Sequence, residues 1–174
     1  ACYSVKVDGS GNVIFAGGTA SNDLSGMTGW QNSYNGGKTD GYVVKMPGDA
    51  SSIIGGSYIG TANYDQAFFV EIDRIDQVYL VGQSQNGSFQ IINSPFGNPG
   101  SSQFVIRLDP TLNVALNSTV FGSGNNAMDI SPSACLVDIC GNIYISGWGK
   151  ALGGSVPAIN MPITTDALQS TTAT

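Results

Sequence analysis

The sequence predicts an all-β fold assembled from a repeated unit. Residues 7–17, 72–82 and 137–147 each run from an apolar residue and an Asp, through a short turn, into an apolar strand that ends on Gly. Corresponding residues of successive stretches lie 65 positions apart. No part of the sequence has the 3.6-residue periodicity of an amphipathic helix. Self-similarity at a fixed period is the signature of a repeat architecture.

The first two strands of the unit form a hairpin. Residues 2–8 alternate between apolar and polar, which predicts a half-buried strand, and residues 13–17 are apolar on both faces, which predicts a central strand. Residues 9–12, Gly-Ser-Gly-Asn, fit the tight turn between them. The residues expected to act as structural turn residues in the three copies are Asp8, Gly11, Asn12, Asp73, Asp138, Gly141 and Asn142.

Two more strands complete the unit. After a long polar connection, residues 41–46 and 52–60 predict a third and a fourth strand, and the pair Gly55-Gly56 predicts a bulge or a close backbone contact. The second unit repeats this order, with strands predicted at 67–73, 77–84, 104–108 and 114–122. The third supplies strands at 134–138 and 142–147, a loop with extra residues at 150–157, and no third or fourth strand.

Four-stranded antiparallel meanders repeated head to tail predict β-propeller blades. Residues 1–65 form the first blade, 66–131 the second and 132–174 the first half of a third. Propellers close with about four to eight blades, so two and a half blades make an incomplete propeller. We expect the remaining blades of a longer parent protein, or other protein chains, to cover the open ends, because exposed sheet faces and edges favour aggregation.

The composition argues against several classes of function. Charged residues make up 10% of the chain, against about 25% in a typical soluble domain, and the net charge is −6. The six basic residues are scattered, which argues against nucleic-acid partners and anionic membranes. No apolar run reaches the roughly 18 residues of a membrane span, so no membrane insertion is expected. Low charge with many small polar residues is typical of an extracellular protein.

The titratable residues predict neither a catalytic site nor a cofactor. Histidine is absent, which excludes Ser-His-Asp and Cys-His catalysis and argues against zinc or copper. Of the three cysteines, Cys135 and Cys140 flank the third turn and either pair or remain thiols, one buried and one in the turn. Acidic residues in the connections either cap turns or supply a glycosidase pair; these are Asp23, Asp40, Asp65, Asp129 and Asp166.

Two groups of residues are candidate binding sites. Asp8, Ser10 and Asn12 place oxygen side chains at alternate positions, as in calcium loops; the alternative is a turn held by side-chain hydrogen bonds. The aromatic residues near the long connections, Trp30, Tyr34 and Trp148, either stack on sugar rings or pack between blades. Surface glycans are therefore a second class of partner.

Several segments resemble the bacterial seven-bladed β-propeller repeats called SBBP. The segments that carry the resemblance are residues 7–19, 40–46, 58–60 and 161–169. Residues 129–134 and 140–149 are similar to a variant found in large secreted surface proteins of Bacteroidetes-type bacteria, which often carry gliding-motility or type IX secretion sorting domains. The second copy departs from the pattern, since Arg74-Ile75-Asp76 replaces the Gly/Asn turn. The resemblance carries no catalytic residues.

Together these observations predict a non-catalytic propeller segment of a secreted or cell-surface bacterial protein, acting as scaffold, adhesin or interaction module. Because the chain opens in a strand-like pattern without a signal peptide, we expect it to be a mature or internal piece of a longer protein. Two alternatives are a carbohydrate-binding or glycoside-acting propeller, and a structural subunit that completes a ring or fibre with other chains.

Overall fold

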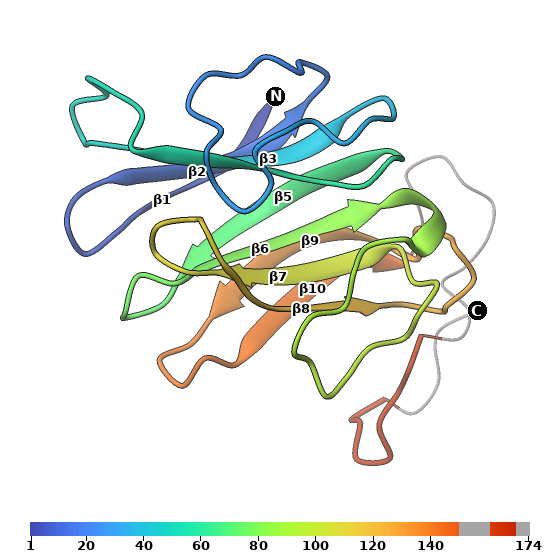
Figure 1. Cartoon of the computed structure of the whole chain (residues 1–174). Helices are drawn as coiled ribbons and strands as arrows, with labels where there is room; N and C mark the ends of the chain where they lie inside the picture. The colour runs from blue at the N-terminus through green and yellow to red at the C-terminus, as the bar shows by residue number, and fades with distance from the viewer. Residues whose placement is uncertain (150–160, 170–174) are drawn as a thin grey trace.

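The computed structural model of the chain, described for residues 1–149 and 161–169, confirms the all-β prediction (Figure 1). Its strands are β1 (Cys2–Val7), β2 (Val13–Thr19), β3 (Asp40–Met46), β4 (Gly55–Ile59), β5 (Asp65–Ile72), β6 (Val78–Ser84), β7 (Gln103–Leu108), β8 (Ala115–Phe121), β9 (Ile130–Val137) and β10 (Ile143–Gly149). A 3₁₀ turn, η1 (Gln85–Gly87), is the one helical element within the described ranges. None of the described helices is long and apolar enough to cross a membrane. The loop predicted at 150–157 lies outside the described residues.

The strands form three antiparallel sheets in the predicted order. The first sheet runs β1-β2-β3-β4, the second β5-β6-β7-β8, and β9 pairs with β10 in a two-stranded sheet. This arrangement matches two complete propeller blades and half of a third. β5 begins at Asp65 and β9 at Ile130, slightly before the boundaries predicted at 66 and 132. Short turns join β1 to β2 and β5 to β6, whereas β2–β3 and β6–β7 pair as antiparallel neighbours across the long connections 20–39 and 85–102.

The first strand of every unit carries a bulge at the same repeat position. Tyr3, Phe68 and Ser133 are the extra residues, and they too lie 65 positions apart. Opposite each bulge stands a glycine of the repeat. A Cβ atom on Gly82 would lie 2.0 Å from the carbonyl oxygen of Gln66, and one on Gly17 would lie 1.9 Å from that of Ala1. The bulge therefore explains why these strands end on glycine.

The glycine pair in β4 makes a close backbone contact and no bulge. The β3–β4 register is continuous from Gly55 to Ile59. Gly56 O accepts a hydrogen bond of 2.8 Å from Gly29 N, and a Cβ atom on Gly56 would lie 2.9 Å from the sulfur of Met27. Of the two predicted roles, the structure selects the second, because the 20–39 connection packs directly on this strand.

The main hydrophobic core lies between the first and second sheets. Because side chains alternate along a strand, Ile14 and Ala16 of β2 point toward the second sheet while Phe15 points away. The first sheet contributes Ile14, Ala16, Val43 and Ile59 to the core, and the second contributes Ala67, Val70, Val78, Leu80, Phe104, Ile106, Leu108 and Val120. The two complete units are thus joined face to face by one continuous apolar layer.

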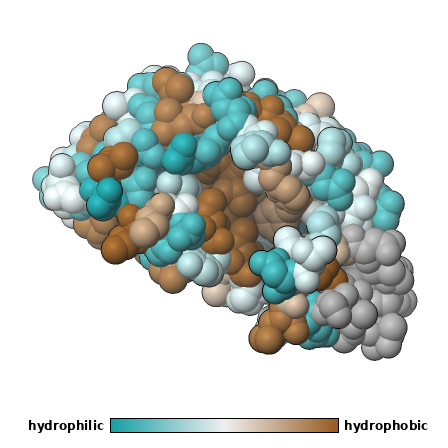
Figure 2. Space-filling view, turned by 90° about the horizontal axis from the view of Figure 1, so that it is seen from below, coloured by the Kyte–Doolittle hydropathy of each residue, from teal (hydrophilic) through white to brown (hydrophobic). Residues whose placement is uncertain are grey.

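The opposite face of the first sheet has no sheet packed on it within the described residues; we call this face, which carries Phe15, Tyr42, Val44 and Met46, the open face. Part of it is covered by the unit's own 20–39 connection, which packs Leu24 and Met27 against it. On another side of the molecule, seen from below the orientation of Figure 1, the surface has a separate hollow with apolar residues in it (Figure 2). Apolar surface left uncovered in this way marks a site of interaction.

Candidate functional site

The first hairpin turn is held by one carboxylate. Asp8 Oδ1 accepts hydrogen bonds from Ser10 N at 2.9 Å and Asn12 N at 2.8 Å, and Asn12 Nδ2 donates to Asp8 Oδ2 at 2.9 Å. Gly11 has φ +82°, the left-handed conformation that glycine adopts without steric cost. Asp138, Gly141 and Asn142 form the same contacts in the third turn. These are the hydrogen bonds of an Asx turn.

A lysine ammonium occupies the remaining side of the Asp8 carboxylate. Lys45 Nζ lies 2.7 Å from Asp8 Oδ2, both side chains are nearly buried, and Lys45 Nζ also donates to Pro110 O. Burial raises the pKa of Asp8, but the hydrogen bonds from Lys45, Asn12 and Ser10 outweigh it and hold the pKa well below its usual range. Asp8 Oδ1 therefore accepts the backbone hydrogen bonds of the turn, and Oδ2 contacts Asn12 and Lys45. This geometry favours the structural interpretation of Asp8, Ser10 and Asn12 over calcium binding.

The second unit replaces this ion pair with a chain of polar contacts. Asp73 Oδ1 accepts hydrogen bonds from its own turn, and Tyr79 OH donates to Asp73 Oδ2 at 3.2 Å. Arg107, at the repeat position of Lys45, donates from Nη1 to Tyr79 Oη at 3.4 Å. A cation on the third strand thus reaches the turn carboxylate directly in one unit and through a tyrosine in the next. Tyr144 OH also donates to the Asp138 carboxylate in the third unit.

The unusual turn of the second unit connects it to the first. Asp76 has φ +62° and takes the left-handed position that Gly11 and Gly141 hold in the other turns. Its Oδ1 accepts a hydrogen bond of 2.8 Å from Gly9 N of the first turn. The departure from the Gly/Asn pattern therefore has a structural reason that only the packing of adjacent units reveals.

The three aromatic residues considered for sugar stacking do not form one site. Trp30 packs against the main core, and its backbone N donates to Leu112 O at 2.8 Å. Tyr34 packs edge-to-face on Tyr58, with ring centroids 5.9 Å apart, in the cluster on the open face. Trp148 lies on β10 and is 65% exposed. Two of the three residues have packing roles, and only Trp148 presents its ring to solvent.

Trp148 lines a hollow of about 410 Å³ between the second and third units. The other residues of this hollow are Phe68, Gln83, Met128, Ser131, Pro132 and Ser133. Gln83 Nε2 donates to Ile130 O at 2.6 Å and connects the two units at this point. Aromatic and apolar walls with few polar groups are typical of small-ligand hollows.

The acidic residues of the connections mostly cap loops. Asp129 Oδ2 accepts from Ser123 N at 2.7 Å, and Asp65 Oδ2 accepts from Thr61 N at 2.7 Å. Asp23 accepts from the Ser21 hydroxyl, and the hydroxyl of Thr164 lowers the pKa of Asp166. Each of these carboxylates accepts a hydrogen bond from a residue close to it in the chain, as expected of a side chain that caps a turn.

Asp40 and Asp65 form the most perturbed pair of carboxyl groups, and the sequence did not indicate that they interact. Burial, helped by the charge of Asp65 and opposed by a hydrogen bond from Asn35 N, raises the pKa of Asp40 to about 6. Burial also raises the pKa of Asp65. They lie 25 positions apart and meet because β3 and β5 begin at the same end of adjacent sheets, where Asp65 N donates to Thr39 O at 2.9 Å.

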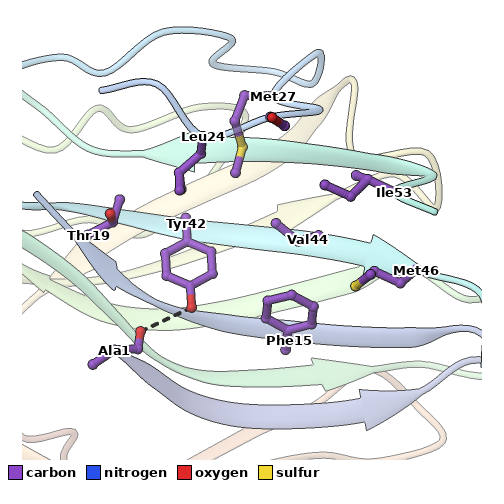
Figure 3. A pocket seen from close by; sticks show the side chains of 10 residues that line it. Ala1, Phe15, Thr19, Leu24, Met27, Tyr42, Val44, Met46 and Ile53 are labelled. Atoms are coloured by element: carbon purple, nitrogen blue, oxygen red, sulfur yellow. Dashed lines mark hydrogen bonds between the residues drawn. The ribbon is translucent and has the colours of Figure 1, made fainter. Parts of the chain in front are cut away.

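The open face contains a groove of about 350 Å³ (Figure 3). Its lining residues are Ala1, Phe15, Thr19, Leu24, Ser25, Met27, Tyr42, Val44, Met46 and Ile53. Tyr42 OH donates to Ala1 O at 3.1 Å across one end of the groove. Sequence reasoning missed this groove as a site, although the apolar residues on both faces of residues 13–17, in β2, predicted a central strand.

All three cysteines are free thiols. Cys135 is partly buried, and its burial raises the pKa of the thiol to about 11, so it is a poor nucleophile at neutral pH. Cys140 is exposed in the third turn. Of the two predicted alternatives for Cys135 and Cys140, the structure has the unpaired one.

No family model matches this chain, and no curated protein matches it either. The repeat, the geometry of its turns and the apolar surfaces of the sheets are the features that bear on function.

Proposed function

We propose that this chain is a non-catalytic β-propeller segment of a secreted or cell-surface bacterial protein, where it serves as scaffold, adhesin or interaction module. The observation that carries this proposal is the way in which the repeat uses its polar residues. Asp8 and Asp73 hold hairpin turns, and Asp76 connects neighbouring turns. A cation of the third strand contacts Asp8 directly in the first unit, whereas in the second unit Arg107 contacts Tyr79, which donates to Asp73. These contacts build and join units, which is the task of a scaffold.

The composition and the resemblance to SBBP repeats support the extracellular part of the proposal. Only 10% of the residues are charged, and Ser, Thr, Asn and Gly fill the connections. The segments that resemble the variant from secreted surface proteins include β10 and its turn, residues 140–149. A role in surface adhesion or gliding motility follows from that resemblance.

Labelling of intact cells tests this function. Antibodies raised against the chain are applied to unpermeabilised bacteria that produce the native protein, before and after digestion of surface proteins with an external protease. We expect labelling of intact cells that the protease removes. Labelling that appears only after permeabilisation would contradict a surface location.

A carbohydrate-binding propeller is the second candidate, and the exposed Trp148 in its hollow favours it. Stacking of a sugar on this indole would change its fluorescence. A glycan panel is screened by tryptophan fluorescence against the wild-type chain and against Trp148→Phe, with Trp30→Phe as the matched control because Trp30 packs in the core. Binding that Trp148→Phe weakens and Trp30→Phe preserves would support this candidate, and absence of any glycan response would remove it.

A further inference from the structure

We propose that the open face of the first sheet is a docking surface for a preceding four-stranded blade of the same repeat. The inference rests on the proposed scaffold function and names the partner that this scaffold takes. The occupant is a sheet that presents aliphatic residues at the positions of Ile14, Ala16, Val43 and Ile59.

The second sheet shows what such an occupant does. Its face toward the first sheet carries Val78, Leu80, Phe104, Ile106 and Leu108, all of which are fully buried. These five residues match, in the same order along the repeat, Val13, Phe15, Tyr42, Val44 and Met46 of the open face. Both sets are apolar, and each occupies the central two strands of its sheet.

The two faces differ in what covers them. Phe15, Tyr42 and Met46 remain partly exposed, whereas Leu80, Phe104 and Leu108 have no exposed surface. On the adjacent β1, Val5 is 57% exposed and Val7 63%, although both are apolar and point to the open face. The open face therefore carries the apolar residues that, in the second unit, contact a neighbouring sheet. Within the described residues, no sheet packs on them.

The long connection that packs on each sheet does not explain this difference in exposure, because both units have one. The 20–39 connection bridges to β4 at Met27 and Gly56, and the 85–102 connection bridges to β8 at Ile92 and Ser118. Phe89 stacks on Phe104 at 4.0 Å in the second unit, in the same region where Leu24 packs in the first. What the second unit has in addition is the apolar face of the preceding sheet.

The width of the open face selects a blade over a second copy of the chain or a small ligand. The exposed apolar positions extend from β1 to β3, whereas the third unit offers only the two strands β9 and β10 in the described part of the chain. One hydrogen bond, from Tyr42 OH to Ala1 O, is the polar contact between the residues drawn in Figure 3. Small-molecule sites normally converge several polar groups, and inter-sheet contacts need none.

A tandem chain tests the proposal. The 65-residue repeat allows residues 1–65 to be placed directly before residue 1 of the full chain. Asp65 of the added unit is then followed by Ala1, which holds the repeat position of Gln66. Phe15→Ala is then made separately in the upstream copy, whose face remains open, and in the downstream copy, whose face the upstream sheet covers. The two variants are otherwise identical in composition.

We expect the downstream substitution to lower the denaturation midpoint about twice as much as the upstream one, because it removes a fully buried ring. Equal effects of the two substitutions, or an upstream unit that adds no β-sheet signal in circular dichroism, would overturn the proposal. Sedimentation of the single chain is the second measurement. Self-association that Phe15→Glu abolishes would assign the face to a second copy instead of a blade. Surface labelling of cells does not affect either result, so the two proposals fail separately.

Discussion

Tyr42 and Phe104 hold the same position in the repeat, yet Phe104 is fully buried and Tyr42 is partly exposed. Likewise, Lys45 contacts its turn carboxylate directly, whereas Arg107 contacts Tyr79, which contacts the carboxylate. The first and second units therefore have one backbone plan and different surroundings. Residues at equivalent repeat positions therefore pair in the same way within each unit. How deeply each of them is buried depends on the neighbouring unit.

The largest expected difference concerns the aromatic position of the third strand. Phe104→Ala removes a buried ring stacked on Phe89 and should lower the free energy of unfolding by about 3–5 kcal/mol. Tyr42→Ala, on the open face, should cost about 1–2 kcal/mol, because part of its ring already contacts water. Urea unfolding followed by circular dichroism measures both. Equal losses would mean that the open face is covered in solution.

The turn carboxylates provide the second comparison. Asp8→Asn leaves the nearly buried Lys45 ammonium without its counter-charge and should cost about 3 kcal/mol at pH 7. Asp73→Asn, which keeps an oxygen for its own turn but loses the acceptor for Tyr79 OH, should cost about 1 kcal/mol. The pKa of Asp8 in the folded state lies below its unfolded value, so its stabilisation is present above about pH 4 and is lost as the pH falls. Unfolding at pH 7 and pH 3 should show the difference between the two variants shrinking in acid.

The alternation and turn chemistry of the sequence were sufficient to predict the four-stranded units and their order. The periodic glycines 17, 82 and 147 were visible too, but not their cause, because a bulge is defined by its partner strand and not by its own residues. Likewise, Asp76 looked like a departure from the turn pattern until Gly9 of the neighbouring unit was placed beside it.

Among the candidate site residues, sequence reasoning indicated turn roles for Asp8 and Asp138 but gave no means of separating Trp30 from Trp148. From the sequence, both lie on or next to long connections, and only the packing of the 20–39 connection directs Trp30 toward the core. The pairing of Asp40 with Asp65 was equally inaccessible, because it depends on the alignment of two adjacent sheets.

The third comparison is between Asp40 and Ser102, which share a repeat position. The folded-state pKa of Asp40, about 6, exceeds its unfolded value, so the folded chain holds a proton that the unfolded chain has released. The free energy of unfolding should therefore fall by about 2–3 kcal/mol as the pH rises from 4 to 7. Asp40→Asn should remove most of this fall, and Ser102→Ala should leave it unchanged. Urea midpoints across that pH range measure it; an unchanged slope in Asp40→Asn would assign the dependence to Asp65.

The smallest expected effect concerns Asp76, where the second turn differs from Gly11 of the first. Its left-handed φ disfavours any side chain by about 1 kcal/mol, and its hydrogen bond to Gly9 N offsets a similar amount. Asp76→Gly should therefore change stability by less than about 1 kcal/mol, because strain and hydrogen bond disappear together. Asp76→Ala keeps the strain, loses the bond and should cost about 1–2 kcal/mol. If both variants lose the same amount in urea unfolding, the backbone conformation is irrelevant and the link between neighbouring turns alone explains the aspartate.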